Sequence, residues 1–210
     1  MTFPDTLFVT GTDTDVGKTV LCAALCAGLD SCYWKPVQAG TEPMTDSERV
    51  RLWSGLPATR IFQERYILRE PMSPHAAADL EDVEISLDDF ETPDTAGRPL
   101  IVEGAGGLIV PINWRETVLD LMVRFRMPVL LVARSGLGTL NHTLLSIRAL
   151  RDAGLEIWGV VLNGPSHPSN EETIRHFGRI ERLFSFPPLE TVEAETLKQQ
   201  FHKSFFGHAS

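Results

Sequence analysis

Short, nearly continuous apolar runs alternate along the chain with longer segments in which apolar residues recur at helical spacing. The runs predict buried strands at residues 7–10, 32–34, 100–102, 129–133 and 157–162. The longer segments predict helices at residues 18–28, 118–125, 139–153, 171–184 and 192–206. Gly28 and Gly154 stand where the first and third of these helices would stop, because glycine readily adopts the conformation that ends a helix.

The segments between these elements carry weaker signals. Residues 41–47 are polar and predict a loop, and residues 47–52 predict a short helical turn. Residues 65–68 predict an extended segment, and Pro74 opens a short helix through residues 76–78. Residues 81–98 are acidic and interrupted by Pro and Gly, which predicts a surface helix followed by a connector.

The order of these elements predicts an α/β fold. Apolar strands that alternate with helices form parallel sheets covered on both faces. We therefore expect a single domain over residues 1–210, with a doubly wound, mainly parallel sheet and helices on both faces. Ligands of such sheets bind beyond the carboxyl ends of the strands. The polar and glycine-rich segments fall at those ends, at residues 11–19, 35, 103–107, 134–138 and 163–164.

Composition limits the classes of partner. The chain has 210 residues, with 28 acidic against 19 basic side chains and a net charge of −9. This balance disfavours nonspecific binding to nucleic acid, which needs Lys and Arg against the phosphates. It does not exclude a small anion held by local N–H groups and one lysine.

The chain also lacks the signals of membrane insertion and export. No run approaches the roughly 18 apolar residues of a membrane span, and the first residues lack the basic and apolar regions of a signal peptide. We therefore expect a cytoplasmic protein with no membrane partner. In that reducing compartment Cys22, Cys26 and Cys32 are expected to be small buried side chains.

The segment GTDTDVGKT at residues 11–19 carries the strongest chemical signal. It follows a predicted strand and opens a predicted helix, the context that a phosphate-binding loop requires. Its glycines let N–H groups face inward, and the helix N-terminus adds partial positive charge. Lys18 would reach the β- and γ-phosphates, and the Thr19 hydroxyl would bind Mg²⁺. The loop is one residue longer than the common pattern, because Thr12 stands where that pattern has its first glycine.

A Mg²⁺ ion in such a site takes a carboxylate as a further ligand. Glu103 ends a predicted strand and would face the loop across the sheet edge, and the glycines after it let backbone approach a ligand closely. Asp46 is a weaker candidate on position alone, since a turn or N-cap aspartate explains it more simply. Lys35, at a strand end, is either a solvated lysine or a cation placed to stabilise an anion.

Together, these motifs resemble the dethiobiotin synthetase family. The segments GTDTDVGKT, WKPVQAG, TDSERV, SPHAAA, VEGAGG, GTLNHT and LNG occur in the family's order and extend over nearly the whole chain. The expanded loop is a family feature as well. The resemblance implies a P-loop NTPase-like fold and an ATP-dependent ligase that joins CO2 to 7,8-diaminononanoate and closes the cyclic urea dethiobiotin. The implied route passes through a carbamate and a carbamic–phosphoric anhydride, with Mg²⁺ as cofactor and ATP as co-substrate.

The resemblance also implies roles for individual residues. Lys18 would hold the transferred phosphoryl group, Lys35 would lie near the carbamate, and Thr14 would lie close to the diamine and carbamate. Thr19, Asp46 and Glu103 match the metal-binding positions. The implied ATP contacts are Asp15, Val16, Gly17, Lys18, Thr19, Val20, Asp46, Glu103, Gly104, Ala105, Gly106, Asn163, Gly164, Pro187, Pro188 and Leu189. Among them Asn163 would read adenine, although a turn before Gly164 suits that residue equally well.

The implied substrate contacts lie in two further segments. Gly138, Thr139, Leu140 and Asn141 resemble the helix start whose N–H groups bind the substrate carboxylate. In the family a neighbouring subunit supplies this segment, so the resemblance implies a homodimer. The family often has Ser or Thr where this chain has Ala39; either Thr41 replaces that contact or the contact is absent, which typically costs about 1 kcal/mol.

Two other function classes share part of the pattern. A regulatory or partitioning ATPase has the same fold and loop but usually carries a lysine directly after the first loop glycine, where this chain has Thr12. An amidotransferase or ligase for a larger acid would need a glutaminase domain, for which the chain is too short, and no cysteine stands beside a histidine in the sequence. The synthetase is therefore the favoured function.

Overall fold

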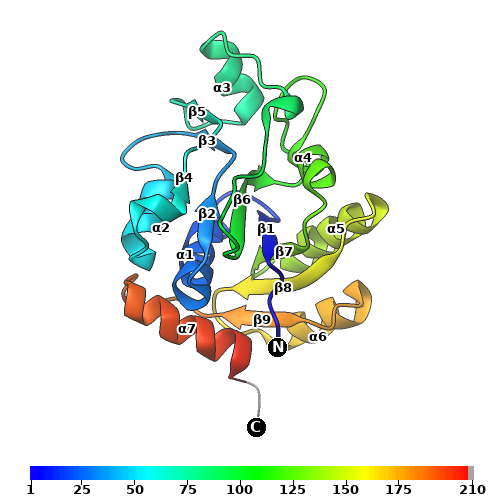
Figure 1. The fold of residues 1–210 in the computed structure, drawn as a ribbon. Coiled ribbons are helices and arrows are strands. Elements are labelled where there is room, and N and C mark those ends of the chain that lie inside the picture. Colours follow the sequence, from blue (N-terminus) through cyan, green and yellow to red (C-terminus); the bar gives the residue numbers. More distant parts are fainter. Residues whose placement is uncertain (208–210) are drawn as a thin grey trace.

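A seven-stranded sheet forms the centre of the computed structural model, which describes residues 1–207. All of its strand pairings are parallel. In spatial order its strands are β4 (Ile61–Phe62), β2 (Cys32–Trp34), β6 (Leu100–Gly107), β1 (Thr6–Gly11), β7 (Val129–Arg134), β8 (Ile157–Asn163) and β9 (Leu183–Phe186), as Figure 1 shows. The predicted α/β class with a parallel sheet is confirmed.

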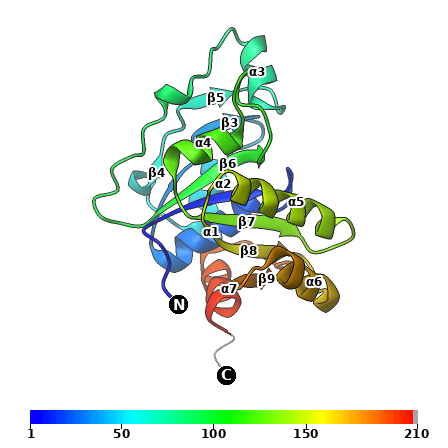
Figure 2. The same cartoon turned by 90° about the vertical axis from the view of Figure 1, so that its right-hand side faces the viewer.

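Helices cover both faces of this sheet, because successive strand side chains point to opposite sides and both sides are apolar. Leu7 and Val9 of β1 pack into one cluster with α1 (Lys18–Leu29), α2 (Asp46–Ser54) and α7 (Ala194–Phe206). Phe8, between them, packs on the other side with α4 (Val118–Phe125), α5 (Thr139–Asp152) and α6 (Pro168–Gly178). Figure 1 shows α1, α2 and α7 on one side of the sheet and α4, α5 and α6 on the other, and Figure 2 looks onto the sheet from the side of α5.

A small lobe stands beyond the carboxyl end of β2. It consists of the two-stranded parallel sheet of β3 (Val37–Ala39) and β5 (Tyr66–Leu68) together with α3 (Pro74–Leu80), and both views place these elements side by side. The chain enters the lobe directly from β2 through Lys35 and Pro36. No helix among the described residues is long and apolar enough to cross a membrane.

Several predicted boundaries were wrong. The predicted helix at 171–184 ends at Gly178, because Arg179 adopts a left-handed conformation with φ 48°, and the chain then forms strand β9. Strands β3 and β4 carried too few residues to be recognised in the sequence. The surface helix predicted within residues 81–98 is reduced to one 3-10 turn over Leu87–Asp89.

Gly28 does not end a helix, contrary to the sequence-based expectation. Helix α1 continues to Leu29, and Asp30 takes the left-handed conformation that ends it. A Cβ atom on Gly28 would lie 2.1 Å from the ring of Phe201, so the absence of a side chain lets α7 pack closely against α1.

We therefore expect Gly28→Ala to destabilise the protein. Alanine normally stabilises a helix by up to about 1 kcal/mol relative to glycine, but here overpacking against Phe201 should lower the free energy of unfolding by about 1–3 kcal/mol. Urea unfolding followed by circular dichroism measures the change. Gly136→Ala, at a position with nothing within 4 Å of the added Cβ, is the control, and a stabilised Gly28→Ala protein would contradict the packing role.

Candidate active site

The glycine-rich loop connects β1 to α1 at the carboxyl edge of the sheet. Gly17, directly before the helix, has φ 93°, a conformation that glycine adopts without strain. A Cβ atom there would lie 1.9 Å from Nδ2 of Asn163, which itself donates a hydrogen bond to the carbonyl of Val16 at 2.9 Å. The loop is also tied to β7, since the N–H of Thr12 donates to the carbonyl of Val132 at 2.9 Å. These contacts tie the loop to the ends of β7 and β8.

Lys18 is the buried cation of this loop. Its Nζ donates to the carbonyl of Asp13 at 2.9 Å, so the side chain folds back over the loop. Burial lowers the pKa of Lys18. The carboxylate of Glu103 raises this pKa and the positive charge of Lys35 lowers it, and the net shift is downward. An anion held by the loop would satisfy this ammonium better than one neutral carbonyl does.

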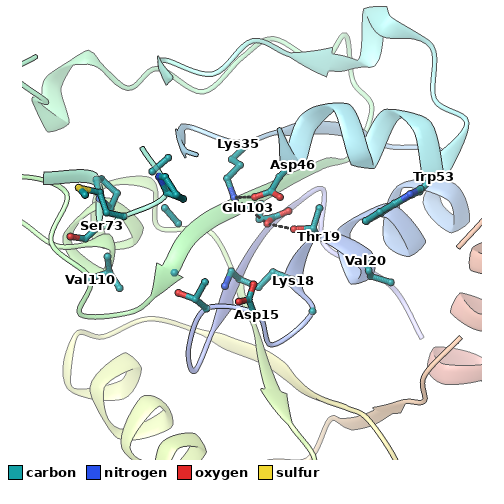
Figure 3. Close-up of a pocket in the computed structure, with 18 residues that line it drawn as sticks. Asp15, Lys18, Thr19, Val20, Lys35, Asp46, Trp53, Ser73, Glu103 and Val110 are labelled. Carbon is teal, nitrogen blue, oxygen red and sulfur yellow. Dashed lines mark hydrogen bonds and ion pairs between the residues drawn. The ribbon is translucent and has the colours of Figure 1, made fainter. Parts of the chain in front are cut away.

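Four side chains from four different elements meet beside the loop, as Figure 3 shows. Nζ of Lys35, after β2, lies 2.6 Å from Oδ2 of Asp46 at the start of α2 and 3.2 Å from Oε1 of Glu103 on β6. The hydroxyl of Thr19 on α1 donates to the same Oε1 at 2.9 Å. The sheet order explains the meeting, because β2 and β6 are neighbours and β6 lies beside β1.

The position of Asp46 corrects the sequence-based interpretation. Asp46 is neither a loop residue nor the N-cap; it is the first residue of α2. Thr45 is the N-cap, and its side chain and that of Glu48 form a reciprocal capping box. The N–H of Asp46 donates to Oε1 of Gln38 at 3.1 Å, which ties the helix start to β3.

The charges of this cluster stabilise one another. Burial by itself would lower the pKa of Lys35, but the carboxylates of Glu103 and Asp46 outweigh burial and raise this pKa well above its usual range. Burial opposes the charge of Asp46 as well, yet Lys35 holds the pKa of Asp46 below its ordinary value. Lys35 is therefore a cation at every pH at which the protein would work.

A cavity of about 670 Å³ opens beside the loop and this cluster. The sequence-predicted residues that line it are Thr14, Asp15, Gly17, Lys18, Thr19, Val20, Lys35, Ala39, Asp46, Glu103, Ala105 and Gly106. Val16 and Gly104 lie buried just behind the wall. Thr41, the alternative to Ala39 as a substrate contact, is not part of the lining.

The other predicted residues lie elsewhere on the same sheet edge. Asn163 ends β8 and pairs in register with Phe186, the last residue of β9. The N–H of Gly164 donates to the carbonyl of Phe186. The segment that follows Phe186 therefore begins beside Asn163; its first residues are Pro187, Pro188 and Leu189. The segment at the start of α5, with Gly138, Thr139, Leu140 and Asn141, does not line the cavity.

Six lining residues were not recognised from the sequence: Trp53, Pro71, Met72, Ser73, Pro74 and Val110. Figure 3 shows Trp53 and Val20 at one end of the cavity and Ser73 and Val110 at the other, with Lys18 and Lys35 between them. Only the SPHAAA motif could have pointed to Ser73 and Pro74. Trp53 carried no motif signal, because it comes from the far end of α2.

The donor set beside the loop fits a Mg²⁺ ion. Mg²⁺ takes hard oxygen ligands, usually one or two carboxylates together with phosphate oxygens and water. Thr19 and Glu103 present a hydroxyl and a carboxylate oxygen 2.9 Å apart. Asp46 adds a second carboxylate nearby, because Lys35 contacts both Asp46 and Glu103. No cluster of three or more His, Cys, Asp or Glu side chains suited to holding a metal by itself occurs within residues 1–207, so such an ion would need phosphate oxygens to complete its coordination.

Comparison with known proteins decides the family. A family model described as "AAA domain" matches residues 5–196. The ATP-dependent dethiobiotin synthetase BioD of Rhodopseudomonas palustris (strain BisB18) is 47% identical over 199 residues, which cover 95% of each chain. The protein of the same name from Afipia carboxidovorans is 46% identical, and the match covers 95% of each chain. The one from Brucella ovis is 45% identical, and the match covers 95% of this chain and 93% of the relative. This chain belongs to the ATP-dependent dethiobiotin synthetase family.

Solved structures agree with this membership at the level of the fold. The cell division ATPase MinD of Pyrococcus furiosus superposes with a TM-score of 0.52 at 14% identity, covering 95% of this chain and 98% of MinD. A ParA family ATPase from Chlorobium tepidum gives 0.50 at 12% identity, covering 95% and 92%. At such low identity the likeness establishes a P-loop NTPase-like fold, and the synthetase family is distinguished by sequence.

Proposed function

We propose that this protein forms dethiobiotin with consumption of ATP, as a carbon–nitrogen ligase of biotin biosynthesis. Membership of the synthetase family supports this function over the regulatory or partitioning ATPase. The observation that carries the proposal is the cavity in which the phosphate-binding loop and the Lys35–Asp46–Glu103 cluster face each other. The loop is suited to the phosphates of a nucleoside triphosphate. The cluster opposite it presents the buried cation Lys35 to a second anion.

The reaction follows from the chemistry of the substrates. One amine of 7,8-diaminononanoate captures CO2 as a carbamate, and a carbamate oxygen attacks the γ-phosphorus of ATP while the bond to the leaving ADP oxygen breaks. The second amine then attacks the carbon of the resulting anhydride and expels phosphate, which closes the cyclic urea. The protein contributes mainly by positioning the reactants and by stabilising charge.

Each charged side chain has a distinct part in this scheme. Lys18 holds the transferred phosphoryl group, and Lys35 stabilises the carbamate and then the departing phosphate. Thr14, which lines the cavity on the loop side, contacts the diamine and carbamate. Thr19, Asp46 and Glu103 hold Mg²⁺, which neutralises phosphate charge when bound.

The shape of the cavity supports a division between the two substrates. With the phosphates at the start of α1, the nucleoside would extend toward Val20 and Trp53. Asn163 and residues 187–189 lie outside the cavity lining, beside one another at the ends of β8 and β9, and we propose that they contact the base. The aliphatic diamine lies against the opposite, mostly apolar end, formed by Ala39, Val110 and residues 71–74.

A homodimer would complete the substrate site. The start of α5 carries N–H groups suited to a carboxylate but does not line the cavity of its own chain. Next to it Leu137 is fully exposed, and Leu145, nearly two turns into α5, is also exposed. We propose that a second copy brings this segment to the cavity.

The deciding experiment supplies purified protein with ATP, Mg²⁺, bicarbonate and 7,8-diaminononanoate. Dethiobiotin is expected in amounts equal to the ADP released, as measured by mass spectrometry and a coupled ADP assay. Omission of the diamine should abolish ADP release. Hydrolysis of ATP that is indifferent to the diamine would favour the partitioning ATPase instead.

Removal of the metal tests the role of the cluster. With excess EDTA we expect dethiobiotin formation to cease and activity to return when Mg²⁺ is restored, because no divalent cation would then neutralise the ATP phosphates beside Asp46 and Glu103. Circular dichroism should not change, since Lys35 pairs both carboxylates without metal. Full turnover in EDTA would contradict the proposed metal site.

A further inference from the structure

Tyr33 is a fully buried neighbour of the Lys35–Asp46–Glu103 cluster, and the proposed mechanism assigns it no task. It lies on β2, and its hydroxyl donates to Oε2 of Glu103 at 2.9 Å. Strand β2 pairs in parallel with β6 so that Tyr33 stands opposite Ile101. Glu103 is two residues further along β6, and its side chain therefore points to the same face of the sheet as Tyr33.

The two oxygens of Glu103 have different partners. Oε1 accepts hydrogen bonds from Thr19 and Lys35, on the side of the cavity. Oε2 accepts from Tyr33, within the protein interior. The hydroxyl thus anchors one oxygen of the carboxylate and leaves the other directed at the loop.

Glu103 needs such an anchor because it is a buried charge, only 1% exposed. Burial of a carboxylate costs free energy unless both of its oxygens accept hydrogen bonds. A carboxylate with hydrogen bonds to only one oxygen can also rotate about its terminal bond. Tyr33 supplies this anchor from a fully buried position, since its hydroxyl donates to Oε2 of Glu103.

We propose that Tyr33 is a positioning residue that orients Glu103 for metal binding. The inference rests on the proposed role of Glu103 as a Mg²⁺ ligand. Residues that hold a metal ligand in place typically contribute about 10- to 100-fold to metal affinity or activity. Tyr33 acts through Glu103 and touches neither the metal nor a substrate.

The test measures binding of Mn²⁺ to the ADP complex by electron paramagnetic resonance, with no reaction taking place. Tyr33→Phe removes only the hydroxyl and should weaken Mn²⁺ binding about tenfold, while ADP binding in EDTA stays unchanged. Tyr66→Phe is the matched control, because the chain has two tyrosines and the Tyr66 hydroxyl contacts Asp89, outside the cavity lining. Equal Mn²⁺ binding by wild type and Tyr33→Phe would overturn the proposal.

A double-mutant cycle separates positioning from general loosening of the fold. Once Glu103→Gln has removed the ligand, adding Tyr33→Phe should cause no further loss of Mn²⁺ affinity. Additive losses would contradict action through Glu103. If wild-type protein with ADP binds no Mn²⁺ at all, the proposed metal site fails, and that result is distinct from failure of the role of Tyr33.

A second measurement needs no substitution at Tyr33. Incorporation of 3-fluorotyrosine gives one fluorine resonance for each tyrosine, and Tyr66→Phe assigns them. Addition of Mg²⁺ to the ADP complex should shift the Tyr33 resonance and leave that of Tyr66 in place. A Tyr33 resonance unmoved by saturating Mg²⁺ would contradict the link between this hydroxyl and the metal.

Discussion

Protein with Lys35→Ala is expected to bind ATP and to form dethiobiotin about 10²–10³-fold more slowly than the wild type. Lys35 lies across the cavity from the loop, and its ammonium contacts Asp46 and Glu103 and no loop atom. We therefore expect its charge to act on the carbamate and then on the departing phosphate. Loss of one such group typically costs about 10²–10³ in kcat, which single-turnover product formation measures, while calorimetric titration should find ADP affinity changed little.

The substitution at Lys35 should also lower stability. Glu103 and Asp46 would lose the cation between them, and removal of one partner of a buried ion pair costs about 3–5 kcal/mol. Mg²⁺ and ADP should restore part of this loss, so thermal unfolding is measured with and without them. Lys198→Ala, which removes an exposed lysine of α7, is the matched control. Product formation at the wild-type rate in folded Lys35→Ala protein would show that the assigned role is wrong.

Lys18→Ala is expected to weaken ATP binding and turnover together. Lys18 belongs to the loop itself, and its Nζ lies over the carbonyl of Asp13, where the β- and γ-phosphates are proposed to bind. Because this ammonium would contact phosphate both before and during transfer, its loss should raise the dissociation constant of ATP at least tenfold and lower kcat about 10²–10³-fold.

The contrast between the two lysines makes these results specific. Lys18 has a carbonyl as its hydrogen-bond partner and a pKa lowered by burial, so its removal relieves a buried charge and should not destabilise the fold. Lys35→Ala should therefore lose stability and keep ATP affinity, whereas Lys18→Ala should keep stability and lose ATP affinity. The same thermal and calorimetric titrations test both, and an unchanged ATP affinity in Lys18→Ala would remove Lys18 from the phosphate site.

Local signals in the sequence were sufficient for the loop and for most of the sheet. The apolar runs that became β1, β6, β7 and β8 are continuous and too short for helices, which favours buried strands. Lys18 followed by helix-forming residues indicates the start of α1. Signals that depend on packing failed. Gly28 resembles a helix stop in sequence, yet its task is to let Phe201 approach.

The sequence by itself determined the α/β class, the phosphate-binding loop and, through ordered motifs, the family. Tertiary structure decided how residues far apart in the chain combine. It showed that Thr45 rather than Asp46 caps α2, that Lys35 lies between two carboxylates, and that Trp53 and Tyr33 belong to the site. The physical reason is that a periodic pattern reports which face of an element is buried. Contacts such as that between Tyr33 and Glu103, 70 positions apart, depend on which strands become neighbours and in what register.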